Sequence, residues 1–394
     1  MTVAYSGKRP WGLGWEAAAF LALLLYPLFP AFESAFFGVT GRSLGEQLPT
    51  VFIFAVLALG LNVVVGYTGL LHLGIAAFFA VGAYVAGILT VAAYPFGAHT
   101  VVALIAGTAA AAVLGLLLGA PTLRLRGDYL ALVTLGFGEV TKFTLRNLEE
   151  ITAGTRGLSP LPPPPPYGGL DWVGDFRPFY YLTLVILLGV YLMLRNIERS
   201  RLGRAWVALR EDELAANCMG LNPAKLKLAA FALGSGLAGL AGVLYATRLT
   251  STADPNAYDF NRSTFMICCI ILGGLGSRPG VLLGVFLLVG FDNILSPILD
   301  AMVQRNLGIT DDIKVPLGPK TLTLPAIMFT FTGWRLSVFG LALILMMRFR
   351  PEGIVPSSRV KHELHPDELV TDPVEPITDY RSGADNPKLN GGPA

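Results

Sequence analysis

Charged and polar side chains inside long apolar stretches are the residues of this chain that could do chemistry. Glu139 and Lys142 lie three positions apart in an apolar block at 128–146, so a helix would place both on one face. They could neutralise each other as a structural ion pair, or they could meet the two charges of an amino-acid zwitterion. Asp292 lies near the middle of a second block, where a carboxylate without polar neighbours is costly. We expect this carboxylate to face polar groups or another subunit, through a structural hydrogen bond or through substrate contact.

The apolar pattern is interrupted at 66–69 by the sequence Gly-Tyr-Thr-Gly, with Asn62 and His72 on either side. Carbonyl groups freed at a broken helix could line a transport pathway here. The alternative for His72 is a hydrogen-bonded residue at a helix end. The candidates for a translocation pathway are Asn62, Tyr67, Thr68, His72, Thr134, Glu139, Lys142 and Asp292.

Patterns for catalysis and metal binding are missing from the sequence. Cys268 and Cys269 are adjacent in an apolar block and Cys218 lies in a polar segment, which provides neither a disulfide framework nor metal-ligand spacing. No phosphate-binding loop of the form G-x-x-x-x-G-K-[ST] occurs. We therefore expect no catalytic residues, no metal and no cofactor in this chain, so that any use of ATP must come from a partner.

Composition indicates that lipid is the solvent of the elements that hold these residues. Of the 394 residues, 53% are hydrophobic and 14% are charged, and the mean hydropathy is +0.59. A soluble domain carries about 25% charged residues. The net charge of +2 and the lack of a basic stripe argue against nucleic-acid binding.

The apolar blocks predict an all-α, polytopic bundle of transmembrane helices with about ten spans, or eight to ten if some are broken. They cover 15–37, 48–66, 71–94, 100–122, 128–146, 178–194, 226–247, 262–274, 279–299 and 334–348. The first block follows Lys8 and Arg9 like a signal peptide, but no cleavage site follows it. We interpret it as a retained helix.

Basic residues predict the orientation of the bundle. The connection at 195–227 is rich in arginine and lysine, and such connections stay in the cytoplasm. With ten spans, both termini are then cytoplasmic. The expected parts are a cytoplasmic N-terminus at 1–14, a transmembrane domain at 15–350 with an external proline-rich loop at 147–177, a cytoplasmic segment at 195–225, and a disordered cytoplasmic tail at 351–394.

The charged connection at 199–222 is predicted to form two helices along the membrane face. Its Ala, Leu and Glu residues favour helix, and Gly220 is a plausible stop. Acidic residues at 211–213 suit the start of the second helix because of its dipole. The segment either only anchors the topology or docks a partner.

Within this segment, Leu214-Ala215-Ala216 followed by Gly220 resembles the EAA loop of ABC-importer permeases, where a short cytoplasmic helix fits a groove on the ATPase subunit. Leu214 stands where that loop has its glutamate, and Glu213 lies one position earlier. Further segments extend the similarity: GLNVVVGYTGLLHLG at 60–74, LRLRGDY at 123–129, VTLGFGE at 133–139, TAGTRGL at 152–158, ILGGLGS at 271–277 and FRPEG at 349–353. Together they resemble the LivM-type permease of branched-chain amino acid ABC importers over most of residues 50–355.

The resemblance implies a non-catalytic permease subunit that works in a complex. The expected partners are a second homologous permease forming a heterodimer, two cytoplasmic ABC ATPases that bind ATP and Mg, and a periplasmic or extracellular substrate-binding protein. The implied coupling residues are Arg204, Arg210, Glu211, Asp212, Glu213, Ala215, Ala216 and Gly220. The implied location is the bacterial cytoplasmic (inner) membrane.

Substrate and mechanism leave alternatives open. The resemblance favours leucine, isoleucine and valine, with urea or short amides as the alternative. A secondary transporter driven by an ion gradient would instead use Glu139, Lys142 and Asp292 as a relay.

Small residues recur every four positions in the block at 226–247. Gly234, Ala238 and Gly242 would let two helices approach closely, so we expect them at a helix crossing.

Overall fold

A computed structural model describes residues 13–29, 33–34, 36–38, 43–122, 128–164, 172, 175–300, 313–317, 320–324, 331–350 and 353–355. The main helices are α1 (Leu13–Leu25), α3 (Leu44–Asn62), α4 (Ile75–Thr90), α5 (Thr100–Thr122), α6 (Asp128–Asn147), α8 (Arg177–Arg199), α9 (Arg201–Glu211), α10 (Glu213–Cys218), α11 (Pro223–Leu249), α12 (Phe260–Gly273), α13 (Arg278–Gly290) and α15 (Phe331–Phe349). Shorter turns are η1 (Tyr26–Leu28), η2 (Val63–Tyr67), α7 (Glu149–Thr152), η3 (Gly154–Arg156), η5 (Pro255–Tyr258) and η6 (Phe291–Leu295).

Several of these helices are suited to cross a membrane. Five are long and apolar enough by themselves: α3 with η2, α5, α8, α11, and α13 continued to Asp300. Shorter apolar helices lie at Trp15–Leu28, Ile75–Thr90, Phe260–Gly273 and Phe339–Phe349. The 20-residue α6 is long enough but carries charges along its length. The predicted multi-pass helical bundle is therefore confirmed.

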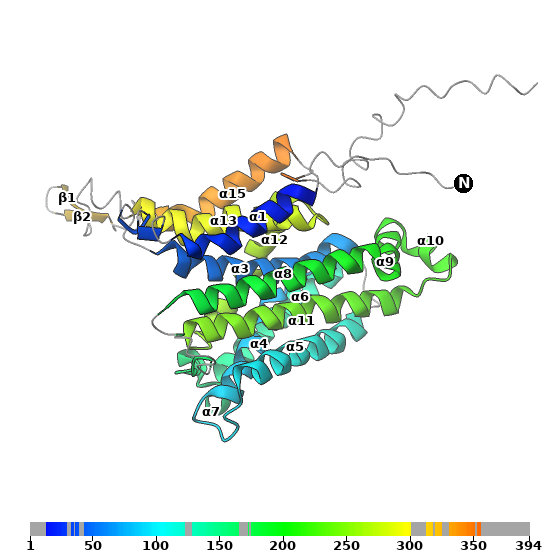
Figure 1. Ribbon diagram of the computed structural model, residues 1–394, viewed down its shortest axis with the longest axis horizontal. Helices are drawn as coiled ribbons and strands as arrows, with labels where there is room; N and C mark the ends of the chain where they lie inside the picture. The colour runs from blue at the N-terminus through cyan, green and yellow to red at the C-terminus, as the bar shows by residue number, and fades with distance from the viewer. Residues whose placement is uncertain are drawn as a thin grey trace, which may run out of the picture.

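Helix α3 occupies the core of the bundle. Every residue from Val51 to Asn62 is buried, and a helix that is apolar all round must be enclosed by protein or lipid. Here it is enclosed by α8, α11, α12 and α13, which all contact it. Most of the helices lie side by side with roughly parallel axes, with α15 at one edge and α5 at the other (Figure 1).

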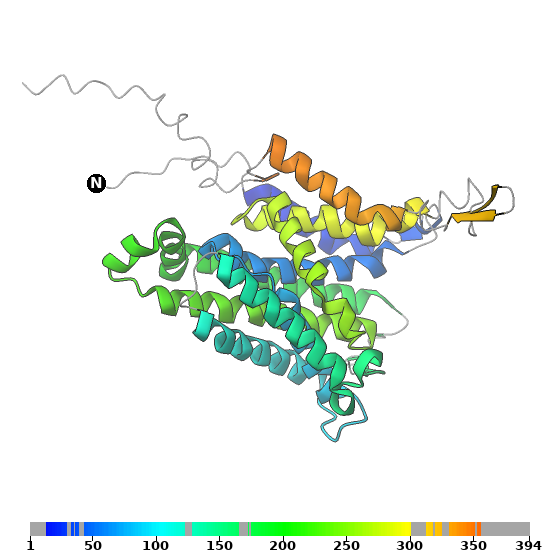
Figure 2. The same cartoon turned by 180° about the vertical axis from the view of Figure 1, so that it is seen from behind.

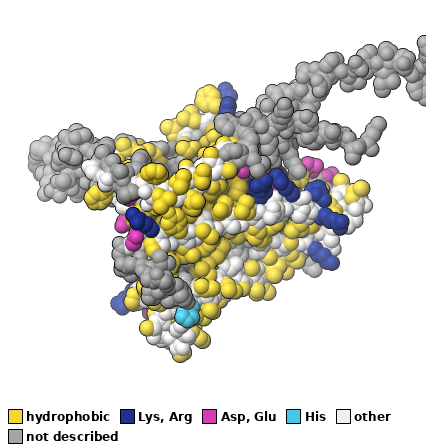
Figure 3. Space-filling model, in the orientation of Figure 1, with side chains coloured by type: hydrophobic (Ala, Val, Ile, Leu, Met, Phe, Trp, Pro, Cys, Tyr) yellow, Lys and Arg dark blue, Asp and Glu magenta, His cyan; other side chains and the backbone are white. Residues whose placement is uncertain are grey.

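The two ends of the bundle differ in what they carry. Helices α9 and α10 project at one end, and a hairpin of β1 (Ile313–Leu317) and β2 (Lys320–Leu324) lies at the other (Figure 1). Hydrophobic side chains cover the middle of the visible face, whereas lysine and arginine gather toward the α9–α10 end (Figure 3). Seen from behind, α6 runs diagonally across the bundle (Figure 2).

Helix α11 crosses its neighbours at positions occupied by small residues. A Cβ on Gly234 would lie 2.9 Å from the Gly60 carbonyl oxygen of α3, and one on Gly242 would overlap the Phe79 carbonyl of α4. Ala238, between them, is fully buried. These three residues thus lie where α11 packs against other helices, because small residues let backbones approach closely.

Between α3 and α4 the chain leaves regular helix at the interruption seen in the sequence. The last turn, η2, is π-helical, and residues 69–74 are not helical. Gly69 has φ of +71°, a conformation that glycine adopts without penalty. The break shortens α4 to Ile75–Thr90, whereas the hydropathy block predicted a start at 71.

The hairpin is an addition to the predicted all-α architecture. β1 pairs antiparallel with β2, with Ile313 opposite Leu324. The hydropathy pattern did not predict it because its ten residues fall between apolar blocks. The predicted N-terminal segment up to residue 12 and most of the predicted tail lie outside the described residues, as do residues 123–127 and the last prolines of the 161–166 run.

Candidate functional site

The 199–222 segment folds as a pair of helices because side-chain caps divide it. Ser200 caps α9, Asp212 caps α10 and Asn222 caps α11, each by accepting a hydrogen bond from the first turn. Asp212 accepts two, from the backbone N–H groups of Leu214 and Ala215, at 2.8 and 3.0 Å. The predicted pair of helices is present, and Asp212 separates the two.

Trp206 and Arg210 anchor α9 to the bundle. Trp206 is fully buried, its Nε1 donates to the Leu226 carbonyl at 2.9 Å, and its ring stacks on Tyr67 with centroids 6.5 Å apart. Arg210 donates from Nη1 to the Gly66 carbonyl oxygen at 2.7 Å. Carbonyl groups in the last turn of a helix lack partners within the helix, so a cation is favoured there. Both anchors therefore connect α9 to the broken end of α3.

Helix α10 is tied to α11 on one side and open on the other. Glu213 pairs with Lys227 of α11, Oε1 to Nζ, at 2.7 Å, and the lysine side chain is only 8% exposed. Ala216 is buried. Leu214 on α10 and Met219, the residue that follows the helix, are 67% and 84% exposed. Apolar side chains displayed on a charged, capped helix are suited to dock into a partner.

The remaining predicted coupling residues lie on or beside this surface. Arg204 is exposed and donates from Nη1 to the Arg199 carbonyl at 3.0 Å. Glu211 and Ala215 are also exposed. Gly220 ends the pair with φ of +83° and no atom near its Cβ position. The predicted residues thus form one surface, except that Arg210 reaches inward and Ala216 is buried.

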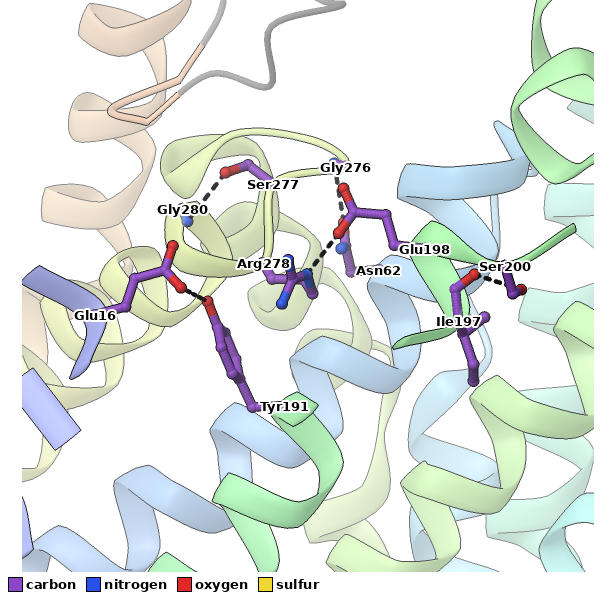
Figure 4. Close-up of polar contacts among 10 residues, drawn as sticks. All are labelled: Glu16, Asn62, Tyr191, Ile197, Glu198, Ser200, Gly276, Ser277, Arg278 and Gly280. Atoms are coloured by element: carbon purple, nitrogen blue, oxygen red, sulfur yellow. Dashed lines mark hydrogen bonds and ion pairs between the residues drawn. The ribbon is translucent and has the colours of Figure 1, made fainter. Parts of the chain in front are cut away.

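A buried ion pair next to this surface was not predicted. Glu198, near the end of α8, pairs with Arg278, the first residue of α13, from Oε2 to Nε at 2.7 Å. The Arg278 side chain is 5% exposed and lies over the Tyr191 ring, 4.9 Å from its centroid. Tyr191 in turn donates to Glu16 of α1 at 2.6 Å (Figure 4). Arg278 alone gave no signal in the sequence, because basic residues at the ends of spans are common.

The polar residues around the break are buried in this conformation. Asn62 Oδ1 accepts from the backbone N–H of Gly276 at 3.0 Å (Figure 4). Thr68 Oγ1 donates to the Val64 carbonyl at 2.6 Å. His72 is 1% exposed, and its ring lies beside the rings of Phe78 and Phe231. Together with the buried Tyr67, these groups pack the break against neighbouring segments.

On α6, the pathway candidates occupy two different environments. Thr134 is fully buried, and its Oγ1 accepts from the backbone N–H of Leu73 at 3.0 Å, which fastens the non-helical segment 69–74 to α6. Glu139 and Lys142 form an ion pair at 2.5 Å and keep 31% and 15% of their side chains exposed. They occupy the half-open surface of α6 rather than the core.

Asp292 is not brought together with the other pathway candidates. It lies in η6, which continues α13 away from Arg278. At 1.5 Å per residue, the fourteen positions between Arg278 and Asp292 span about 20 Å. The candidates therefore fall into groups at the break, on α6 and near the opposite end.

The α9–α10 end is in direct contact with several helices of the bundle. Arg210 and Trp206 connect α9 to the break, and Glu198 is separated from α9 only by Arg199 and Ser200 and holds α13. A displacement of α9 and α10 would thus reach α3, α8 and α13 through direct contacts. Among the described residues, no three His, Cys, Asp or Glu side chains are grouped to hold a metal ion.

Comparison with known proteins places the chain among transport permeases. Residues 43–347 match the protein family described as branched-chain amino acid transport system / permease component. The chain is 39% identical over 333 residues to the high-affinity branched-chain amino acid transport system permease protein LivM of Escherichia coli (strain K12), covering 79% of this chain and 70% of the relative. It is 27% identical over 258 residues to a probable branched-chain amino acid transport permease protein LivM of Methanocaldococcus jannaschii, covering 64% of this chain and 67% of the relative. It is 30% identical over 131 residues, 32% of each chain, to the xylose transport system permease protein XylH of Escherichia coli (strain K12). No solved structure matches significantly.

Proposed function

Because this chain belongs to the permease family of branched-chain amino acid transport systems, we propose that it carries leucine, isoleucine and valine across the membrane. The predicted membership of the family and the predicted role as a permease component are confirmed. The choice of substrate rests on the relatives, whose names specify branched-chain amino acids. Urea and short amides are the alternative substrates.

The exposed face of α10 is the observation that carries the proposed mechanism. We infer that Leu214 and Met219 enter a groove on a cytoplasmic ATPase, which binds the ATP and Mg. The Asp212 cap and the Glu213–Lys227 pair keep α10 in a fixed orientation on the bundle. ATP-driven movement of the ATPase would then pass through Arg210 to the break in α3.

We further propose an orientation and a set of partners for the chain. The α9–α10 end faces the cytoplasm, and with ten spans both termini lie there too. The importer comprises this chain, a second homologous permease, two ATPases and a substrate-binding protein on the external side. The bacterial inner membrane is the proposed location, and Glu139 and Lys142 on the half-open α6 surface line the pathway.

Substitution of the exposed α10 side chains tests the proposed coupling. In proteoliposomes that hold the complete importer, Leu214→Asp combined with Met219→Asp should lower ATP-driven leucine uptake at least about tenfold, because charges replace the apolar contact. Cys218→Ser is the matched control, since it changes an exposed neighbour while keeping its size, and it should transport normally. Normal uptake by the double variant, with the chain inserted, would refute the coupling role of α10.

Charge reversal tests the same helix through its tether. Glu213→Lys places two cations together and should uncouple ATP hydrolysis from uptake, whereas adding Lys227→Glu should restore much of the coupling.

The alternative functions have their own readouts. Uptake of urea in place of leucine would favour the alternative substrates. Uptake driven by an ion gradient in vesicles holding this chain alone would favour a secondary transporter.

A further inference from the structure

A cavity of about 460 Å³ opens at the end of the bundle opposite α9 and α10. Its walls come from the first turns of α3, the last turn of α11 and the π-helical turn η6. The lining side chains include Phe37, Glu46, Gln47, Thr50, Arg248 and Asn293. Its volume falls within the range of small-molecule sites, about 300–1,000 Å³. None of these residues belongs to the coupling surface or to the break.

Arg248 is a cation that the protein holds with neutral groups. Its Nε donates to Thr50 Oγ1 at 3.1 Å, and its Nη2 donates to the backbone carbonyl of Glu46. Within the described part of the chain, no carboxylate lies at ion-pair distance from it. A guanidinium has five N–H groups in a planar fork, so these two bonds leave donors for a ligand. A carboxylate is the group that such a fork binds best.

Glu46 places a negative charge on the wall of the same cavity. Its side chain is exposed, and its carboxylate makes no hydrogen bond or ion pair with any described residue. It is close enough to Arg248 to act on its charge, yet the two side chains do not pair. A cation and an anion kept apart in one cavity can each meet the opposite charge of a zwitterion.

Two further side chains suit the same ligand. The Oε1 atom of Gln47 is buried and has no hydrogen-bond partner among the described residues, so it can accept from an ammonium group. Phe37, which lines the cavity, provides an apolar contact and is 56% exposed.

We propose that this cavity binds an aliphatic α-amino acid as a zwitterion, before it enters the permease. Arg248 binds the carboxylate, Glu46 and Gln47 bind the ammonium group, and Phe37 contacts the aliphatic side chain. This assignment rests on the proposed function, because an amino-acid importer presents its substrate at the external end. The site would receive substrate about 40 Å from the α9–α10 surface, as the length of α11 indicates.

The test measures binding of isotope-labelled leucine to the complete importer in nanodiscs, without the binding protein. Glu46→Gln and Arg248→Gln should each weaken binding about tenfold or more, because each removes a charged partner. Glu46→Gln keeps the shape of a side chain without partners, so it should not disturb folding. Arg248→Lys keeps the charge but not the fork, and should fall between Arg248→Gln and the unaltered chain.

Ligand analogues separate direct contact from a structural effect. The unaltered site should prefer leucine over 4-methylpentanoate, which lacks the ammonium group, and over 3-methylbutylamine, which lacks the carboxylate. Glu46→Gln should reduce the first preference alone, and Arg248→Gln the second alone. Glu150→Gln and Arg156→Gln are matched controls, exposed charges at the same end that should leave binding unchanged.

The outcomes distinguish this site from the proposed function. If the unaltered importer transports leucine but the Glu46 and Arg248 variants bind it normally, or with unchanged preferences, the cavity is not the site. If leucine does not bind the unaltered importer at millimolar concentration, the proposal is likewise overturned. If the complete importer fails to transport leucine at all, the proposed function itself is wrong.

Discussion

Charged side chains form ion pairs at one end of the bundle, whereas those that line the cavity at the other end do not. At the α9–α10 end, Glu198 is paired with Arg278 and Glu213 with Lys227, and the basic partner of each pair is almost fully buried. At the other end, Glu46 and Arg248 line one cavity without pairing. Paired buried charges hold helices in one arrangement, whereas unpaired charges around a cavity remain free for a ligand. The proposed roles follow this division, with coupling assigned to the first end and ligand binding to the second.

The largest effect that should separate the two ends is on stability. Glu198→Gln leaves Arg278 buried without a counter-charge, and should lower the free energy of unfolding by about 2 kcal/mol, after allowance for the partial exposure of Glu198. Glu46→Gln at the opposite end breaks no contact and should leave stability unchanged. Unfolding midpoints of the purified chain in detergent provide the measurement. Equal shifts for the two variants would abolish the distinction between the ends.

Arg210→Gln should produce the next largest effect. It removes a charged hydrogen bond to the Gly66 carbonyl, which contributes about 1.5 kcal/mol. It should also make ATP hydrolysis by the complete importer independent of leucine uptake, since α9 loses a contact with the break in α3. Arg204→Gln is the matched control because its bond to the Arg199 carbonyl is on the surface. Comparable coupling defects in both variants would show that the inward contact has no special role.

The smallest expected effect concerns backbone conformation at the α9–α10 end. Gly220→Ala introduces a side chain where φ is +83° and should cost about 1 kcal/mol, although no atom is near to clash. Gly136→Ala on α6 also meets no neighbour but has helical φ, so it should be neutral or stabilising. Hydrogen exchange in α10 and unfolding midpoints provide the readout. Gly220→Ala should make hydrogen exchange in α10 faster, and Gly136→Ala should leave it unchanged. The opposite result for either variant would contradict this account.

Local patterns in the sequence were enough to predict much of this architecture. Apolar blocks predicted helices because a chain in lipid must satisfy its backbone hydrogen bonds within each segment. Glycines at 66 and 69 indicated the break, and the acidic residues at 211–213 indicated the start of α10, whose cap is Asp212. Glu139 and Lys142 are close in the sequence, and as expected from a helix they form an ion pair.

Contacts between distant segments were decided only by the tertiary structure. Arg210 and Gly66 are 144 positions apart, Glu198 and Arg278 are 80 apart, and Arg248 reaches the Glu46 carbonyl across 202 positions. Hydropathy and helix signals act over about 20 residues, so they predict which segments are helices but not which side chains meet. The sequence therefore determined that this chain is a helical membrane permease. Packing of α3 against α11, α8 and α13 decided which charges are paired and which are not.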